Sequence, residues 1–560
     1  MTTDQAIDLA IEHQRRGRPA EAERILRQVL AVEPENLNAL QLLGVCALRQ
    51  GRHDQAVALL QRAVQRVPHS AEVLNNLGLA LHGAGRDREA VEAYRRALAI
   101  NDRLPLVWNN LANALRELGR CEEAFEPARR AVELDPTPAA AGGFVQSLLY
   151  HPAYTAEALY EAHRQWARRY ADPLTAEAPP HDNDRSPQRR LRLGYLSPDF
   201  REHVVGRNFL PLLEHHDRRQ FELYAYSQSA AHDWLTARLR AGFDHWRDIA
   251  TIPDPQVAQL IRADRIDILV DLALHTADNR LLVMARRPAP VQVAHMGYPA
   301  TTGLEAIDYR FTDVHLEPPE RGDALSSEVP VRLRSFWCFD PIEPAPPVGD
   351  LPALSAGRIT FGSLNAAHKV TQPTIELWAD VLHAVPASRL LLLTGRPNDE
   401  NPEMAERFAR LGVAAGRILF RSKRPREAYL RIYGEIDIGL DTFPYNGHTT
   451  SCDAFWMGVP VITMVGHTSV GRAGASLLRN LGLGELVART PQQFLQIAAD
   501  LAGDLPRLAE LRRGMRHRMR TSPLMDYQGY ARQVESAYRQ MWRAWCEGRP
   551  AEFGNLAKSD

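Results

Sequence analysis

A unit of 34 residues repeats through the first quarter of the chain. Each unit carries a glycine followed by arginine, at Gly17, Gly51, Gly85 and Gly119. Five residues after each glycine comes an alanine, at Ala22, Ala56, Ala90 and Ala124, and the units end at Pro34, Pro68, Asp102 and Pro136. Glycine permits a tight turn between two helices, alanine lets the helices approach closely, and proline ends the second helix. One helix pair cannot bury its own apolar stripe, so the units must stack into a superhelix with a concave groove.

This spacing resembles the tetratricopeptide repeat. The pairs Leu43-Gly44, Leu77-Gly78 and Leu111-Ala112 keep the same phase. We therefore predict an all-α tetratricopeptide superhelix over residues 1–136. Such grooves hold extended peptides, so the resemblance implies a protein or peptide partner bound in the groove. Four asparagines of the first helices could hydrogen-bond a peptide backbone, or could equally be solvated or bonded to neighbouring turns: Asn75, Asn76, Asn109 and Asn110.

The charge of the chain is balanced, with 67 Lys+Arg against 68 Asp+Glu. There is no global positive field to attract nucleic acid or an anionic membrane, so neither is expected as a partner. The five cysteines form no C-x-x-C pair, which argues against a disulfide framework or a cysteine zinc site. The sequence shows no signal-peptide pattern and no run of ~18–20 apolar residues that could span a membrane. We expect a cytoplasmic protein.

From residue 191 the pattern changes to short apolar runs separated by helical stretches, which is typical of βαβ units and a mostly parallel sheet. One series contains LRLGYLS, FELYAYS, DILVDLA, VQVAHMG and YRFTD, and a second contains RITFGSL, RLLLLTG, RILFRS, DIGLDT and VPVITM. We predict two Rossmann-like halves facing a cleft. The predicted boundaries are 137–185 for a helical extension and linker, 186–340 for the first half, 341–357 for a connector, 358–548 for the second half and 549–560 for a tail.

Familiar nucleotide and metal motifs are missing from this α/β region. It has no G-x-x-x-x-G-K-[ST], no G-x-G-x-x-G at the first strand of either half, and no H-E-x-x-H. NAD enzymes, P-loop ATPases and zinc proteases of that type are therefore disfavoured. The one D-x-D-like triplet, Asp182-Asn183-Asp184, lies in the predicted linker and away from any strand end. We expect neither a metal nor a cofactor.

Three strand ends carry candidate site residues, because ligands bind outside the carboxyl ends of parallel strands. Lys369 follows RITFGSL and could neutralise a phosphate, or could be a solvated loop lysine. His448, Thr449 and Thr450 follow DIGLDT and open a helix, with one of the threonines as its N-cap, so they could cradle a diphosphate or merely cap the helix. Asp453 lies a turn later and could reach ribose hydroxyls. His203 follows the first strand of the first half, as a site residue or a structural histidine.

The whole pattern resembles the O-linked N-acetylglucosamine transferases, in a bacterial form. The resemblance rests on the repeats together with LRLGYLSPDFREH, PVQVAHMGYPATTG, IDYRFTD, FGSLNAAHKV, LDTFPYNGHTTSCDAFWMGVPVITM, ASLLRNLGL and SPLMDY. It implies a two-Rossmann (GT-B type) enzyme that transfers N-acetylglucosamine from UDP-N-acetylglucosamine to Ser or Thr hydroxyls of proteins. The resemblance further implies inversion at the sugar and no metal.

The same resemblance assigns roles residue by residue. Lys369 would contact the diphosphate, His448, Thr449 and Thr450 would hold the phosphates, Asp453 would bind ribose, and His203 would be a base or a sugar contact. Asn365 and Arg426 belong to the nucleotide segment, but Ala366, Arg426 and Tyr429 stand where animal members have glutamine, lysine and histidine, so the uracil contacts differ.

The base and the cleft lining are left open by the sequence. His203 is our candidate for the base, because a histidine titrates near neutral pH, and a UDP phosphate oxygen, Asp308 or Asp313 could serve instead. His295 and Tyr298 could line the cleft or belong to the core and a turn. Two other functions fit the pattern: a repeat scaffold with an inactive nucleotide-sugar domain, and a transferase for another UDP-hexose.

Overall fold

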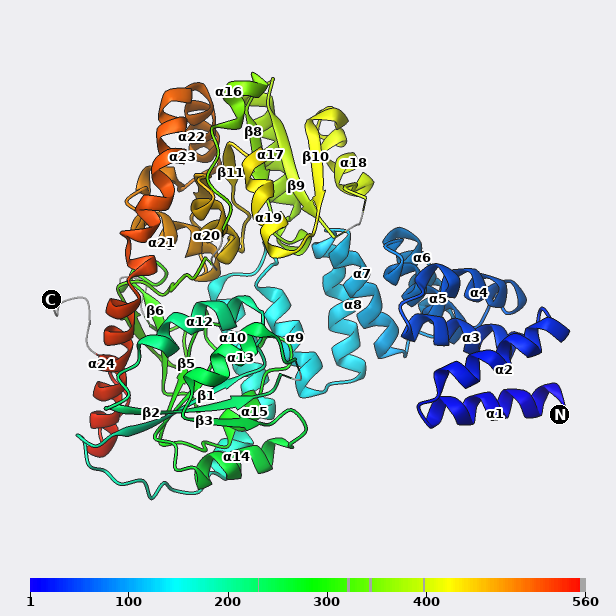
Figure 1. Cartoon of the computed structure of the whole chain (residues 1–560), viewed down its shortest axis with the longest axis horizontal. Helices are drawn as coiled ribbons and strands as arrows, with labels where there is room; N and C mark the ends of the chain where they lie inside the picture. Colours follow the sequence, from blue (N-terminus) through cyan, green and yellow to red (C-terminus); the bar gives the residue numbers. More distant parts are fainter. Residues whose placement is uncertain (230, 320–322, 342–344, 396–397, 554–560) are drawn as a thin grey trace. The chain divides into compact units, whose positions relative to one another are not determined.

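The computed structural model describes residues 1–229, 231–319, 323–341, 345–395 and 398–553. The chain divides into two compact units, Met1–Ala140 and Ala141–Asp560. The first unit contains only helices, drawn in blue tones in Figure 1, and the second contains two parallel sheets with helices packed around them.

Helix pairs build the first unit. They are α1 (Thr3–Arg15) with α2 (Pro19–Val32), α3 (Leu37–Arg49) with α4 (His53–Arg66), α5 (Ala71–Gly83) with α6 (Asp87–Ile100), and α7 (Pro105–Glu117) with α8 (Cys121–Leu134). The repeated glycines end the first helix of each pair with φ between 69° and 71°, a left-handed conformation that glycine adopts without strain. The repeated alanines are buried in the second helices. The predicted tetratricopeptide array is confirmed.

Two of the four asparagines singled out above contact each other. Asn110 Nδ2 donates to Asn75 Oδ1 at 3.0 Å, which joins α7 to α5. Asn75 and Asn110 are half-buried. These two side chains therefore tie neighbouring units together.

The first sheet of the second unit is parallel throughout its described strands. These are β1 (Leu191–Ser197), β2 (Phe221–Ser227), β3 (His245–Asp248), β4 (Ile268–Asp271), β5 (Val291–Ala294), β6 (Tyr309–Asp313) and β7 (Val329–Leu333). Their order in the sheet is β3-β2-β1-β4-β5-β6-β7. The order reverses between β1 and β4, which places a ligand crevice at the carboxyl ends of those two strands.

The second sheet repeats this arrangement. Its strands are β8 (Thr360–Ser363), β9 (Arg389–Thr394), β10 (Ile418–Ser422), β11 (Ile438–Leu440), β12 (Val461–Met464) and β13 (Val487–Ala488). Their order is β10-β9-β8-β11-β12-β13, again all parallel, with the reversal between β8 and β11. The two predicted Rossmann-like halves are confirmed.

The remaining helices connect and cover the sheets. They are α9 (Pro138–Leu148), α10 (Ala156–Tyr170), α11 (Asp172–Ala176), α12 (Val204–His215), α13 (Trp234–Gly242), α14 (Asp254–Ala263), α15 (Leu281–Ala285), α16 (Pro352–Ala356), α17 (Gln372–Ala384), α18 (Pro402–Arg410), α19 (Arg426–Ile432), α20 (Thr449–Trp456), α21 (Ala473–Asn480), α22 (Pro491–Gly503), α23 (Leu505–Arg520) and α24 (Tyr527–Cys546). None of the described helices has the length and apolarity needed to cross a bilayer.

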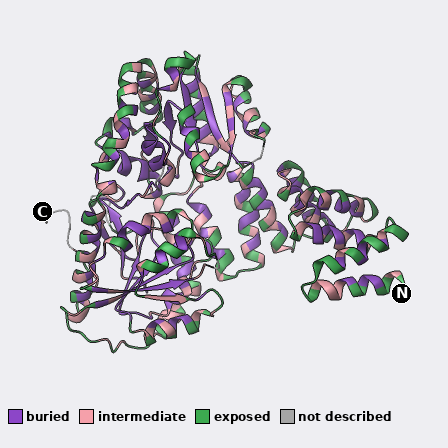
Figure 2. Cartoon of the chain, viewed as in Figure 1, coloured by how far each residue is buried: buried purple, intermediate pink, exposed green. Residues whose placement is uncertain are grey.

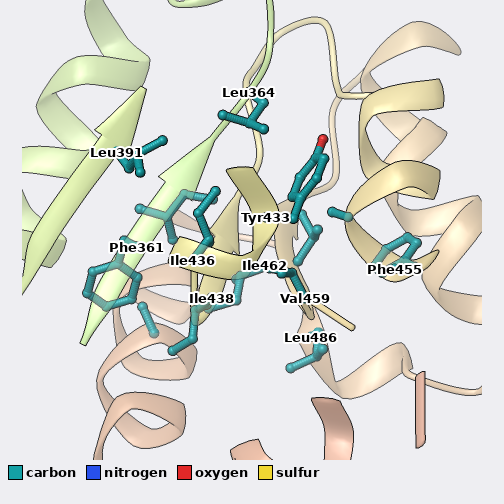
Figure 3. Close-up of a cluster of buried hydrophobic side chains, with 14 of the residues drawn as sticks. Phe361, Leu364, Leu391, Tyr433, Ile436, Ile438, Phe455, Val459, Ile462 and Leu486 are labelled. Atoms are coloured by element: carbon teal, nitrogen blue, oxygen red, sulfur yellow. The ribbon is translucent and has the colours of Figure 1, made fainter. Parts of the chain in front are cut away.

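Each half has its own apolar core, and the buried strands run through both of them in Figure 2. The core of the second half is shown in Figure 3. It includes Phe361 of β8, Leu391 of β9 and Ile438 of β11. The core of the first half includes Tyr530, Tyr538 and Trp542 of α24. The range predicted for the second half, 358–548, thus includes α24, although the apolar face of α24 packs on the first half. There it contacts α12, β5 and β7.

Candidate active site

The candidate site lies at the carboxyl ends of β8 and β11, where the strand order of the second half reverses. The loop after β8 carries Asn365 and, in a short 3₁₀ turn (Ala367–Lys369), Lys369. The loop after β11 runs from Asp441 to His448 and leads into α20. Two segments far apart in the sequence are thus brought to one sheet edge by the topology.

Lys369 turns its ammonium toward the loop after β11. Its Nζ donates to the Asn446 backbone oxygen at 2.9 Å and lies 4.1 Å from the centroid of the Tyr445 ring. Burial lowers the pKa of Lys369 to about 8, against the opposing effect of Asp441. The ammonium has one carbonyl and one aromatic face as partners and is poorly solvated. An anionic ligand would therefore stabilise its charge strongly.

Asp441 fixes the turn that leads to the helix. Its carboxylate accepts from Thr463 Oγ1 and from the Gly447 backbone N, both at 2.6 Å. Burial raises the pKa of Asp441 to about 6. These hydrogen bonds hold the carboxylate in place. Its negative charge favours the protonated form of Lys369.

The start of α20 offers unsatisfied donors. The N-cap is His448 rather than either threonine, and its side chain makes no capping hydrogen bond, so the first backbone N–H groups of the helix keep their capacity for a ligand. The Nε2 atom of His448 is buried without a partner among the described residues. Burial, with the nearby charge of Lys369, lowers the pKa of His448 well below its ordinary value, so the ring is neutral.

Asn365 and Thr450 join the two loops. Thr450 Oγ1 donates to Asn365 Oδ1 at 3.0 Å, and the Thr450 backbone oxygen accepts from the Tyr433 hydroxyl at 2.9 Å. The loop after β8 therefore sets the position of the first turn of α20. Lys369, His448 and Thr450 were predicted from two strand ends and Asn365 from the family resemblance, and the structure brings these four side chains to the same sheet edge.

Arg426 and Asp453 form a buried pair beside this site. Arg426 Nη1 donates to Asp453 Oδ2 at 2.6 Å, and Nη2 donates to Oδ1. Asp453 is 3% exposed. Burial alone would lower the pKa of Arg426, but the Asp453 carboxylate outweighs it and the pKa is raised. Asp453 is thus ion-paired, and only its remaining lone pairs are left for a ribose hydroxyl.

His203 is the N-cap of α12 in the first half. Its Nδ1 lies 3.4 Å from the Val205 backbone N and 3.3 Å from Asp199 Oδ1. Without a proton Nδ1 accepts from Val205, and with a proton it donates to Asp199. Burial lowers the pKa of His203, against the opposing charge of Asp199. In the tautomer with the proton on Nδ1, that nitrogen donates to Asp199 Oδ1. Nε2 then has a lone pair that can accept a proton from a ligand.

Arg207 places this end of α12 opposite the second half. Burial and the charge of Arg426 lower the pKa of Arg207, while Asp453 opposes the shift, so Arg207 faces the Arg426–Asp453 pair. The Nε atoms of Arg207 and Arg426 are both buried without partners in the described part of the chain. Arg426 pairs with the Asp453 carboxylate and Arg207 with Glu202. The spare donors of the two guanidinium groups fit an electron-rich ligand.

Comparison with known proteins identifies the family of the chain. The model of Glycosyl transferase family 41 matches residues 172–342 and 351–534, and a tetratricopeptide-repeat model matches residues 7–71, 47–105 and 75–139. The chain belongs to glycosyl transferase family 41.

Two curated relatives resemble this chain over most of its length. The "probable UDP-N-acetylglucosamine–peptide N-acetylglucosaminyltransferase SPINDLY" of Oryza sativa is 40% identical over 428 residues, which are 74% of this chain and 46% of the relative. The UDP-N-acetylglucosamine–peptide N-acetylglucosaminyltransferase of Caenorhabditis elegans is 25% identical, over 65% of this chain and 42% of the relative. The chain spans about half the length of these curated relatives.

One solved family structure covers nearly the whole chain. A mutant of the Thermobaculum terrenum O-GlcNAc transferase is 37% identical, with a TM-score of 0.78 over 98% of both chains. The similarity includes the repeats as well as both Rossmann-like halves.

Three residues considered for the cleft, His295, Tyr298 and Asp313, are buried. His295 is 1% exposed and its Nε2 lies 2.7 Å from the Tyr530 hydroxyl of α24. Asp313 is buried and accepts from Leu316 N and from Ser476 Oγ of α21, at 2.9 and 2.7 Å. Tyr298 is buried as well. These side chains hold loops and helices together, which favours the core interpretation of His295 and Tyr298. Asp308 likewise pairs with Arg287 at 3.0 Å.

Sequence reasoning missed Arg207 and Tyr445. Arg207 lies four residues after His203, one helical turn along α12, so the spacing could have found it. Tyr445 lies in the same loop as His448, but an aromatic residue after a strand gives no signal of a ligand site on its own. A further signal was overlooked for Lys369: the sequence contains three lysines, Lys369, Lys423 and Lys558, among 67 basic residues, so a lysine at a strand end stands out from the composition.

Proposed function

We propose that this chain transfers N-acetylglucosamine from UDP-N-acetylglucosamine to serine and threonine hydroxyls of proteins, with inversion at the sugar and without a metal. The observation that carries the proposal is the meeting of Lys369 with the uncapped start of α20 at the switch point of the second half. An ammonium and free N–H groups at a helix start suit a diphosphate. The names of the relatives support the donor and the peptide acceptor.

The chemistry follows from where charge develops. The acceptor oxygen attacks the anomeric carbon, the bond from that carbon to the β-phosphate oxygen breaks, and the electron pair stays on UDP. Lys369 and the first N–H groups of α20 stabilise this growing negative charge. They therefore stabilise the transition state more strongly than the ground state. The acceptor hydroxyl gives its proton to His203 Nε2. Attack opposite to the leaving group gives inversion in a single displacement.

The test incubates the purified full chain with UDP-N-acetylglucosamine, UDP-glucose or a GDP-linked sugar, together with proteins from a lysate of its source. Mass spectrometry then locates sugar on serine and threonine peptides. We expect label from UDP-N-acetylglucosamine alone. Label from another donor would refute the donor assignment, and tight UDP binding without any label would indicate an inactive nucleotide-sugar scaffold.

Activity should fall on the alkaline side. Because Lys369 is protonated only below its pKa of about 8, kcat/KM for the donor should drop about tenfold per pH unit above that value. A Lys369→Arg variant keeps its charge at all these pH values, so whatever activity it retains should stay level. A wild-type profile that remains flat through pH 9.5 would contradict the role of Lys369.

His203 can be tested apart from its structural task. His203→Ala and His203→Asn should both lower kcat by about 10²–10⁴-fold if Nε2 accepts the proton, with UDP affinity within about threefold of wild type. Asparagine can still cap α12, since it is a preferred N-cap. Restored activity in His203→Asn would show that the histidine acts only as a cap.

A further inference from the structure

Tyr150 lies in the turn after α9, in the helical segment that precedes both Rossmann-like halves. Its ring stacks on Tyr445, with centroids 4.7 Å apart and an angle of 19° between the planes. Tyr445 in turn stacks on His448, at 4.7 Å and 28°. The three rings form a column, Tyr150, Tyr445 and His448, which we call the aromatic column.

The aromatic column reaches the reactive side of the candidate site through Tyr445. Lys369 Nζ lies over the Tyr445 ring and donates to the carbonyl of the next residue, Asn446. Tyr150 also contacts the residue before Lys369, because the His368 ring meets it edge-on at 4.8 Å and 78°. One side chain therefore touches both the ring beneath the ammonium and the turn that carries it.

We propose that Tyr150 is a positioning residue of the donor site: it holds the Tyr445 ring and so fixes the Lys369 ammonium and the His448 ring for the diphosphate. The inference rests on the proposed function for what Lys369 binds. It makes the segment after the repeats a working part of the site, since neither half supplies this support. The repeat array leads directly into α9, so Tyr150 is also the first residue of the donor site along the chain.

Stacked rings fix orientation as well as burying area, since offset and edge contacts each favour a narrow geometry. The Tyr445 ring is buried, so loss of Tyr150 would leave a gap that water can enter beside Lys369. The titratable groups near the ammonium are Asp441, just after β11, and His448 at the start of α20, whose ring is neutral. Hydration would then favour the charged form of the lysine.

The experiment measures Lys369 directly. Acylation of amines at a series of pH values, followed by mass spectrometry, gives the titration midpoint of Lys369, with the exposed Lys423 of the same chain as internal reference. The variants are Tyr150→Ala, which opens the gap, and Tyr150→Phe, which keeps the ring. Tyr170→Ala is the matched control, because Tyr170 belongs to the same segment but packs on Trp166 at 5.6 Å.

We expect the midpoint of Lys369 to rise by at least half a pH unit in Tyr150→Ala, and to stay unchanged in Tyr150→Phe and Tyr170→Ala. UDP affinity, measured by calorimetry, should fall about tenfold in Tyr150→Ala alone, as for a lost aromatic pair. Circular dichroism confirms that the variants fold. If Tyr150→Ala should lose its structure, the same measurements on Tyr150→Leu, which fills more of the gap, replace it.

The outcomes separate the two proposals. An unchanged Lys369 midpoint and UDP affinity in folded Tyr150→Ala would overturn the positioning role, and so would equal damage in Tyr150→Phe. Wild-type protein that binds no UDP would contradict the proposed function instead, while the Lys369 midpoints would still decide whether Tyr150 acts on the ammonium.

Discussion

Replacing Lys369 with alanine should lower kcat for sugar transfer by about 10²–10³-fold, the usual loss when one preorganised donor to a developing negative charge is removed. The effect should be larger on kcat than on UDP affinity, because the charge on the diphosphate grows as the glycosidic bond breaks. Single-turnover transfer and calorimetric UDP binding measure the two quantities separately.

Lys423→Ala is the matched control, since Lys423 is exposed and lies in a loop of the same half. That variant should keep the wild-type rate. If Lys369→Ala loses UDP affinity and rate by the same factor, Lys369 would contribute uniform binding rather than transition-state stabilisation. If neither quantity changes, the diphosphate is held elsewhere.

Replacing Asp453 with alanine should cost about 3–5 kcal/mol of stability, because it leaves the buried Arg426 guanidinium without its carboxylate. The loss is aggravated by Arg207, whose charge is already opposed by Arg426. Chemical denaturation measures this loss as the change in the free energy of unfolding of the second unit. UDP binding should fail together with stability.

The double variant Arg426→Met/Asp453→Leu separates charge from volume. It should regain most of the stability, since apolar residues often replace a buried ion pair at little cost, while UDP binding stays weak. Glu427→Ala is the comparison on the same helix, where the exposed Arg431–Glu427 pair, 64% exposed on each side, should contribute about 0–1 kcal/mol. A similar loss for Glu427→Ala and Asp453→Ala would contradict the special weight given to the buried pair.

The architecture was readable from local patterns because each element carries its own signal. The glycine phase marks the repeats, since φ near 70° recurs at every unit. The apolar runs RITFGSL and DIGLDT became β8 and β11, which flank the switch point. Lys369 and His448 were therefore predictable, as residues of the loops that follow two strands whose carboxyl ends meet.

Other parts of the site depend on contacts that only the folded chain makes. Arg426 lies on α19 and Asp453 on α20, and no pattern in either segment predicts that the two side chains form an ion pair. His295 and Asp313 resemble cleft residues in sequence, but packing against Tyr530 and Ser476 buries them. The contact of Tyr150 could not be predicted for the same reason, because its partner Tyr445 lies almost three hundred residues later, in the second half.

The return of α24 to the first half also has a consequence for synthesis. The side chains of Tyr530, Tyr538 and Trp542 complete a core whose strands lie between Leu191 and Leu333, far earlier in the chain. A ribosome makes those strands long before it makes the helix, so the nascent first half must wait with apolar surface uncovered. The second half, whose strands and covering helices up to α23 precede α24, can close while the chain is still growing. Biogenesis of the enzyme would then finish with the half that began first.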